Sequence, residues 1–268
     1  MLTDTHCHLA SARYETTEVP AIIERAQAAG VRRLITLATD LEDLELSLDL
    51  AQRSSVYACI GIHPCSAHEV TTDVIETLRS YVSDPRVAAI GETGLDYFHN
   101  APDGWTEENF RKHQRALLRA HFELASDAGL NVVIHTRDRE GDQSLQDALA
   151  IYDDFRNNVR AVFHCFIQGS SQMQQVLDRG GIVSFGGVMT FKNAHMVRET
   201  ARLAPVGSFM LETDSPYLAP DPFRSQRNEP AYLLRIAECL AQLRGESLDE
   251  LAGHCEKTAG AFFRLLEK

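Results

Sequence analysis

The stretch MLTDTHCHL (residues 1–9) decides the fold class, because it has the pattern of a β-strand and ends in two histidines that flank one cysteine. Side chains alternate between the two faces of a strand, so His6 and His8 share one face and Cys7 points to the other. An open doubly wound sheet normally carries a glycine-rich phosphate turn after its first strand. This chain has His-Cys-His there instead, which favours a closed barrel.

Short apolar strands recur along the chain, and helical patterns lie between them. The strand candidates span 1–9, 32–38, 56–63, 86–96, 131–137, 160–166, 181–187 and 208–218. Strand–helix alternation is typical of parallel strands joined by crossover helices, and eight such units close a TIM-type barrel. We therefore predict an α/β fold, a (β/α)8 barrel, and assign residues 1–268 to a single domain.

Three helices carry clear boundary signals. The segment 106–129 begins with Thr106 as a capping residue and stops at Gly129. Two further helices are expected to close the chain. One begins near Asn228, and the other begins at a capping box that runs from Ser247 to Glu250.

The composition narrows the class of protein. Six cysteines occur without a C-x-x-C pair, which indicates reduced thiols and a cytoplasmic protein. The first residues lack a secretory signal pattern, and no apolar run is long enough to span a membrane. The formal net charge of −12 excludes a strongly basic nucleic-acid binder, so any nucleic acid must be held by a local site.

Chemistry-bearing side chains recur at the carboxyl ends of the predicted strands, where TIM barrels carry their active sites. These residues are His8, His63, Glu92, Asp96, His135, Arg137, His164, Glu212 and Asp214. A single histidine at a strand end is usually structural. Many buried imidazoles and carboxylates at one barrel mouth are costly unless a cation lies among them, so the pattern predicts a metal centre.

Six residues are candidate metal ligands: His6, His8, Glu92, His135, His164 and Asp214. A catalytic zinc ion uses about three protein ligands and a water molecule, so six ligands suit two divalent metal ions bridged by Glu92. Imidazole-rich sites favour zinc, manganese, iron or nickel over magnesium alone. Paired metal ions of this kind stabilise the attacking and leaving oxygens of a phosphoryl displacement.

Several motifs in a fixed order resemble the TatD family of metal-dependent deoxyribonucleases, which belongs to the amidohydrolase-like metal-dependent hydrolases. The motifs are DTHCHL (4–9), GIHP (61–64), IGETGLDY (90–97), VVIHTRD (132–138), HCF (164–166) and LETDSPYLAP (211–220) followed by RNEP (227–230). The resemblance covers nearly the whole chain. It implies a metal-dependent hydrolase barrel that cleaves phosphodiester bonds in DNA with two metal ions, taken here as zinc, manganese or magnesium.

The resemblance also implies individual roles. The strand-one histidines and Asp214 hold one metal ion, the two later histidines hold the other, and Glu92 bridges them. Asp214 also orients or deprotonates the attacking water. Glu212 then holds a metal-binding residue in its orientation. His63 contacts substrate or donates a proton. Arg137 is expected to clamp a phosphate, because a guanidinium matches phosphate oxygens in bidentate fashion.

The leading prediction is thus a monomeric, cytoplasmic deoxyribonuclease with DNA as its partner. The alternative is a metal-dependent amidohydrolase or esterase acting on a small C–N or ester substrate, which the net charge of −12 favours. Amidohydrolases with paired metals often bridge them with a carboxylated lysine on the fourth strand, and this strand offers Glu92 instead. A binding module with a vestigial metal site is a third reading, which the intact set of ligands disfavours.

Overall fold

The computed structural model describes residues 1–70 and 73–265. Residues 71–72 and 266–268, which the predicted domain includes, lie outside the described part. Within it, eight parallel strands pair in chain order, each with the next. They are β1 (Leu2–Cys7), β2 (Val31–Leu37), β3 (Val56–Ile60), β4 (Val87–Tyr97), β5 (Val132–Asp138), β6 (Ala161–Phe163), β7 (Ile182–Phe185) and β8 (Phe209–Leu211). The predicted barrel with eight parallel strands is confirmed.

The barrel closes between β1 and the segment that follows β8. The hydroxyl of Thr5 donates to the carbonyl of Leu211 at 2.9 Å, and the backbone N–H of Asp214 donates to the carbonyl of His6 at 2.8 Å. Cys7 and Ser215 form an isolated parallel bridge at the same seam. These contacts bring the two ends of the sheet together and place Asp214 beside the strand-one histidines.

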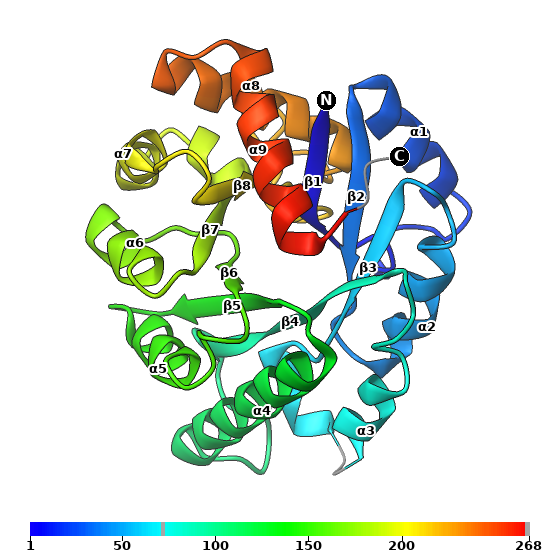
Figure 1. The fold of residues 1–268 in the computed structure, drawn as a ribbon, viewed down its shortest axis with the longest axis vertical. Helices are drawn as coiled ribbons and strands as arrows, with labels where there is room; N and C mark the ends of the chain where they lie inside the picture. Colours follow the sequence, from blue (N-terminus) through cyan, green and yellow to red (C-terminus); the bar gives the residue numbers. More distant parts are fainter. Residues whose placement is uncertain (71–72, 266–268) are drawn as a thin grey trace.

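The described residues form nine α-helices, of which α1 to α8 lie around the strands and α9 lies across one end of the barrel (Figure 1). They are α1 (Val19–Ala28), α2 (Leu41–Leu50), α3 (Val74–Arg79), α4 (Glu107–Ala128), α5 (Gln143–Tyr152), α6 (Ser170–Leu177), α7 (His195–Leu203), α8 (Leu233–Arg244) and α9 (Leu248–Phe263). Short 3-10 helices cover Pro64–Glu69, Gly187–Thr190 and Pro230–Tyr232. None of these helices combines the length and the apolar character that a bilayer crossing requires.

The predicted helix ends are largely confirmed. The Thr106 hydroxyl accepts the N–H of Asn109 at 3.2 Å, and Gly129 ends α4 in the left-handed conformation. Ser247 and Glu250 form the predicted capping box of α9. The helix predicted near Asn228 is displaced: α8 begins at Leu233, because a 3-10 turn over Pro230–Tyr232 comes first.

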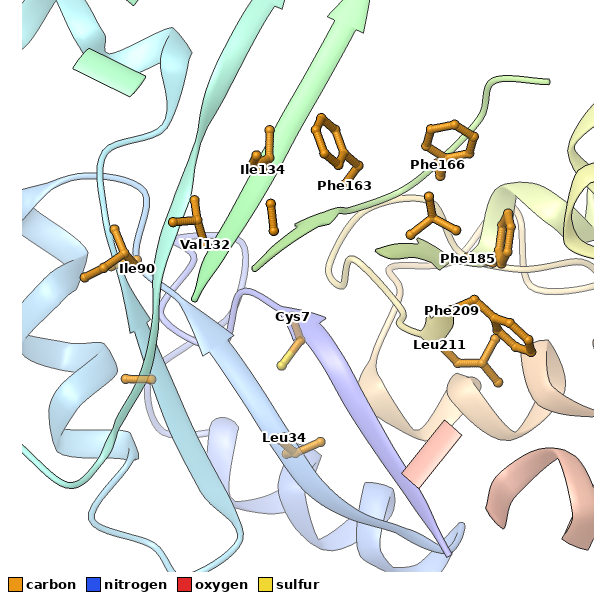
Figure 2. Packing of buried hydrophobic residues seen from close by; sticks show 14 of the residues in the cluster. Cys7, Leu34, Ile90, Val132, Ile134, Phe163, Phe166, Phe185, Phe209 and Leu211 are labelled. Atoms are coloured by element: carbon orange, nitrogen blue, oxygen red, sulfur yellow. The ribbon is translucent and has the colours of Figure 1, made fainter. Parts of the chain in front are cut away.

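The larger of two apolar layers lies between the strands and the helices. Figure 2 shows part of it, with labelled residues that run around the barrel from Cys7 on β1 and Leu34 on β2 to Phe209 and Leu211 on β8. Cys7 is fully buried, and its thiol donates to the carbonyl of Ile35 at 3.3 Å. The cysteine of the opening motif therefore packs on the face of β1 opposite to its two histidines, as the alternation predicted.

The smaller apolar layer fills the barrel interior. It contains residues that alternate along the strands with those of the outer layer, such as Ile35 on β2 and Val133 on β5. Helix α9 contributes Phe262 and Phe263 to this interior cluster, and Asn131 donates to the carbonyl of Phe262 at 2.6 Å. Burial of each phenylalanine contributes about 1.5–3 kcal/mol. Asn131 directly precedes β5, so α9 closes the amino-terminal end of the barrel and leaves the opposite end for the site.

Five strands (β1, β3, β6, β7 and β8) are shorter than predicted, and β8 and β6 differ most. The predicted strand 208–218 is reduced to β8, because Thr213 and Asp214 pair with β1 side chains and carbonyls instead of extending the ladder with β7. The predicted strand 160–166 is reduced to β6, and Cys165 follows it with a positive φ of 43°. Both departures bend the chain directly at the carboxyl end of the barrel.

Candidate active site

The six candidate metal ligands all lie at the carboxyl end of the barrel. His6 lies in β1 and His8 directly follows it, Glu92 lies in β4, and His135 lies in β5. His164 follows β6 directly, and Asp214 follows β8. All six are buried or nearly so, and all except His6 line one cavity of about 660 Å³, a volume typical of small-molecule and substrate sites.

The first group consists of His6, His8 and Asp214, whose ligand atoms all lie within 4.8 Å of one another. The two Nε2 atoms of the histidines are 3.1 Å apart. Oδ1 of Asp214 lies 3.7 Å from Nε2 of His6 and 3.4 Å from Nε2 of His8. Oε2 of Glu92 lies 3.2 Å and 3.4 Å from the same two nitrogens. Four ligand atoms therefore converge on one small volume.

The second group gathers around the other oxygen of Glu92. Oε1 lies 2.8 Å from Nε2 of His164, 3.0 Å from Nδ1 of His135 and 3.5 Å from Nε2 of His63. His135 Nδ1 and His164 Nε2 are 3.3 Å apart. The two carboxylate oxygens of Glu92 thus face two different histidine groups, which is the arrangement expected of a bridging ligand.

The outer nitrogens of three histidines face oxygen acceptors. Nδ1 of His8 lies 3.3 Å from the carbonyl of Leu37, and Nε2 of His135 lies 3.2 Å from Oδ2 of Asp96. Nδ1 of His164 lies 3.4 Å from Oε1 of Glu212. A neutral ring with its proton on the outer nitrogen would leave the lone pair of the inner nitrogen available to a metal ion.

His63 has the opposite arrangement. The backbone N–H of Cys65 donates to Nδ1 of His63 at 3.1 Å, so the proton of the neutral ring lies on Nε2, which faces Glu92. Burial lowers the pKa of His63 to about 3. His63 is thus a neutral hydrogen-bond donor at the cavity wall, which suits contact with a substrate oxygen better than metal binding.

Glu212 is fully buried behind His164. Its Oε1 accepts the backbone N–H of Cys165 at 2.6 Å, and its Oε2 accepts the hydroxyl of Ser184. These two bonds hold the carboxylate in one orientation next to the His164 ring. Glu212 thus faces the outer nitrogen of His164, and its supporting role stays a prediction.

Asp4 supports the opposite side of the site and had no role in the sequence-based prediction. Its carboxylate accepts the backbone N–H of Thr213 at 2.9 Å and the hydroxyl of Thr213 at 2.6 Å. Burial raises the pKa of Asp4 to about 8. Asn228, from the RNEP motif, donates to the carbonyl of Thr213 at 2.8 Å. Both residues fix the segment that carries Asp214, which has a left-handed φ of 56°.

The charges of the centre are strongly coupled. Burial raises the pKa of Glu92, but His164, His63 and His6 lower it, and the net pKa lies well below the usual range. Burial lowers the pKa of His164, whereas Glu92 and Glu212 raise it well above the usual range. The buried carboxylates therefore require positive charge among the imidazoles. Divalent cations supply such charge, and a set of imidazole nitrogens and carboxylate oxygens fits zinc or manganese.

Gly94 sets the distance between β4 and β5 at the site. It has a φ of +149°, and a Cβ atom built there would lie 2.0 Å from the carbonyl oxygen of His135. Only glycine tolerates this approach. Gly94, the second glycine of the GETGLD segment, thus lets β4 and β5 approach closely enough for Glu92 and His135 to face the same metal position.

Two arginine–aromatic pairs stand at the cavity. Arg137 lies with its guanidinium carbon 4.0 Å from the ring centroid of Phe98, and Arg13 lies 4.7 Å from the ring centroid of Tyr217. Arg13, Arg137 and Tyr217 line the cavity, and Phe98 is partly exposed. Arg137 was expected here. Arg13 and the two aromatic residues were missed, because they lie on loops or strand ends where apolar periodicity carries no signal.

Nearly the whole chain is similar to known proteins. The model of the family described as TatD-related DNase matches residues 3–264. The uncharacterized metal-dependent hydrolase YabD of Bacillus subtilis is 32% identical over 267 residues, which cover 99% of this chain and 100% of YabD. The 3'-5' ssDNA/RNA exonuclease TatD of Enterobacter lignolyticus is 31% identical over 250 residues, which cover 91% and 92% of the two chains.

A solved structure agrees with these sequence matches. The TatD homologue YjjV of Escherichia coli superimposes with a TM-score of 0.88 and is 29% identical, covering 99% of this chain and 98% of YjjV. The family resemblance carried by the motifs is thereby confirmed.

Proposed function

The chain belongs to the TatD-related DNase family, and we propose that it is a metal-dependent deoxyribonuclease that hydrolyses phosphodiester bonds in DNA. The observation that carries this proposal is the position of Glu92, whose two oxygens face two separate groups of histidines. A carboxylate whose two oxygens face separate groups of histidines supports the binding of two divalent metal ions rather than one.

The chain's own residues divide between two metal positions. His6, His8 and Asp214 would hold one ion, His135 and His164 would hold the other, and Glu92 would contact both. Divalent ions held there would act as Lewis acids, stabilising the negative charge that develops on the phosphoryl oxygens and lowering the pKa of the attacking water. Zinc, manganese and magnesium remain the candidate ions.

Asp214 would accept the proton of the attacking water. Burial raises the pKa of Asp214, but hydrogen bonding to His8 and the charges of His6 and His164 lower it below its usual value. The carboxylate is therefore ionised at neutral pH. The water oxygen bonds to phosphorus as the P–O bond to the leaving deoxyribose oxygen breaks, and that oxygen takes a proton from solvent.

The cavity wall supplies contacts for a phosphate chain. Nε2–H of His63 is available to donate a hydrogen bond to a phosphate oxygen, and Arg137 is available to bind the phosphate in bidentate fashion. Both arginines of the cavity lie over aromatic rings, and rings of this kind stack on unpaired bases. The two arginines supply local positive charge in a chain whose net charge is −12. The aromatic rings beside them support a single-stranded substrate.

We also propose a cytoplasmic location for the enzyme. All six cysteines are free thiols in the structure, which supports a reducing compartment such as the cytoplasm. The predicted monomeric state stays a prediction.

The test is cleavage of end-labelled single-stranded and double-stranded DNA by the purified full-length chain in Mn²⁺ or Mg²⁺, with an EDTA-treated sample as the control. We expect metal-dependent cleavage that is faster on single strands than on duplex, and the ladder of labelled products reports whether cleavage starts from an end or within the strand. A panel of amide and lactone substrates in the same buffers tests the alternative. Turnover of that panel without any cleavage of DNA would replace the proposal with an amidohydrolase.

A further inference from the structure

A third cluster of metal-ligating side chains lies beside the two groups around Glu92. It consists of Cys65, Asp96 and His99, whose ligand atoms all lie within 4.8 Å of one another. Cys65 lies in the 3-10 helix that follows β3, Asp96 lies near the end of β4, and His99 lies two residues beyond that strand. None of the three belongs to the six ligands of the proposed catalytic centre.

The distances within the cluster are short. Nδ1 of His99 lies 2.9 Å from Oδ2 of Asp96 and 3.5 Å from Sγ of Cys65. The other oxygen of Asp96, Oδ1, accepts the backbone N–H groups of Phe98 and His99 at 2.9 Å and 2.8 Å. The carboxylate is thereby held with Oδ2 directed at the thiol and the imidazole.

The burial of the three residues suits a site that an ion can enter. The Asp96 side chain is only 1% exposed, whereas the His99 side chain is 53% exposed. Cys65 is half-buried between them. Asp96 and His99 also line the cavity of the catalytic centre. An ion at the cluster would therefore be reachable from solvent and would stand at the wall of the same cavity.

The donor atoms point to a particular class of metal. A thiolate, an imidazole and a carboxylate form a mixed set that suits the borderline-soft zinc ion, whereas magnesium and calcium prefer oxygen ligands alone. Three protein ligands also leave one position of a tetrahedral zinc ion open. The catalytic groups around Glu92 contain no sulfur ligand, so the chemistry of the two places differs.

We infer that Cys65, Asp96 and His99 form an additional zinc-binding site on the wall of the active-site cavity. Binding exchanges the thiol proton of Cys65, which is released to solvent, for a sulfur–metal bond. Asp96 connects this site to the catalytic centre, because its Oδ2 also lies 3.2 Å from Nε2 of His135. The inference does not depend on the proposed DNase activity, since it concerns binding alone.

Cobalt substitution tests the site directly, because Co²⁺ bound to a thiolate gives a near-ultraviolet charge-transfer band that nitrogen and oxygen ligands do not give. The full-length chain is freed of metal with a chelator and titrated with Co²⁺. We expect a thiolate band whose intensity at saturation corresponds to one thiolate-bound Co²⁺ per chain, beside the ions at the sulfur-free catalytic centre, and which Zn²⁺ displaces. The variant Cys65→Ser should lose the band, and His99→Gln should bind this ion at least tenfold more weakly.

The matched control is Cys165→Ser, because Cys165 lines the same cavity but belongs to no ligand cluster of the described residues. This variant should keep the band unchanged. Far-ultraviolet circular dichroism of all three variants checks that they are folded. Absence of a thiolate band in the unmodified chain, or a band that survives Cys65→Ser, would overturn the inference. A band that disappears only in Cys165→Ser would overturn it as well.

Discussion

Oε1 of Glu212 lies 3.4 Å from Nδ1 of His164, on the side of the ring that faces away from Glu92. The two residues are far apart in the sequence, and the carboxylate is held in place by Cys165 and Ser184. Acceptors in this position fix the tautomer of a metal-binding histidine and raise its basicity.

The first prediction concerns Glu212→Gln. The amide keeps the shape of the side chain but removes the negative charge behind His164, so we expect Mn²⁺ to bind about 10–100-fold more weakly. Titration of the metal-free chain with Mn²⁺, followed by electron paramagnetic resonance, measures this change. Glu199→Gln on the exposed face of α7 is the control and should leave the dissociation constant unchanged. An unaltered constant in Glu212→Gln would show that this carboxylate does not tune the site.

The second prediction concerns Arg137, which lies over Phe98 at the cavity. Arg137→Ala should raise KM for single-stranded DNA about tenfold and reduce the salt slope of binding by about one, because one phosphate contact is lost. Arg137→Lys should keep the salt slope and recover only part of the affinity, since lysine lacks the planar fork. Arg160→Ala, at the start of β6 and the opposite end of the barrel, is the control. If Arg137→Ala and Arg160→Ala behave alike in KM and salt slope, Arg137 does not hold phosphate.

The third prediction concerns the pH dependence of stability. His121 is buried in α4, where its Nε2 accepts the backbone N–H of Ile62 at 3.1 Å and its Nδ1 donates to the carbonyl of Leu117 at 2.8 Å. Burial lowers the pKa of His121 to about 4. In the unfolded chain the pKa is about 6.5. As the pH falls, this histidine is protonated in the unfolded chain before it is protonated in the folded chain. The stabilising contribution of neutral His121 is therefore fully present above pH 6.5 and is lost as the pH falls towards 4.

Urea unfolding in EDTA at pH 7.5 and pH 5.5 tests this prediction. The free energy of unfolding of the unmodified chain should fall by about 1 kcal/mol more between these pH values than that of His121→Gln. The variant is less stable at pH 7.5, because it loses part of the packing around the ring. Equal losses for the chain and for His121→Gln would contradict a buried neutral imidazole.

The fourth prediction concerns Gly94. An alanine there places Cβ against the carbonyl of His135 in a conformation with φ of +149°, so Gly94→Ala should destabilise the fold by about 1–3 kcal/mol or more. Metal binding should weaken as well, since β4 and β5 must separate. Gly253→Ala in α9 is the matched control, because its Cβ meets no atom within 4 Å, and it should stabilise the chain by about 0.5–1 kcal/mol. Thermal unfolding and Mn²⁺ titration of both variants measure these effects.

The barrel and the ligand positions could be predicted from the sequence because both depend on periodicity. Alternation along β1 separates His6 and His8 from Cys7, and the carboxyl ends of parallel strands meet at one edge. The residues predicted from these two rules all lie at that end of the structure. The comparisons confirm the family and the fold, while the roles of the individual residues stay proposals.

What the sequence did not predict lies where the chain departs from a regular ladder. Arg13 follows β1 in a loop, and no periodic pattern places it over Tyr217. The segment after β8 is irregular because Asp4 binds Thr213 across the barrel seam, a contact between residues about two hundred positions apart. The cluster around His99 likewise depends on the path of a loop after β4. Such contacts are fixed by tertiary packing, which local propensity does not report.

The most direct test of the central claim is the variant Glu92→Gln, measured for Mn²⁺ stoichiometry and for turnover on end-labelled single-stranded DNA. If the carboxylate of Glu92 joins two metal positions, the amide variant should stay folded, lose at least one equivalent of bound Mn²⁺, and cleave DNA at least about 10²-fold more slowly. Turnover near that of the unmodified chain, with the bound Mn²⁺ unchanged, would contradict the account.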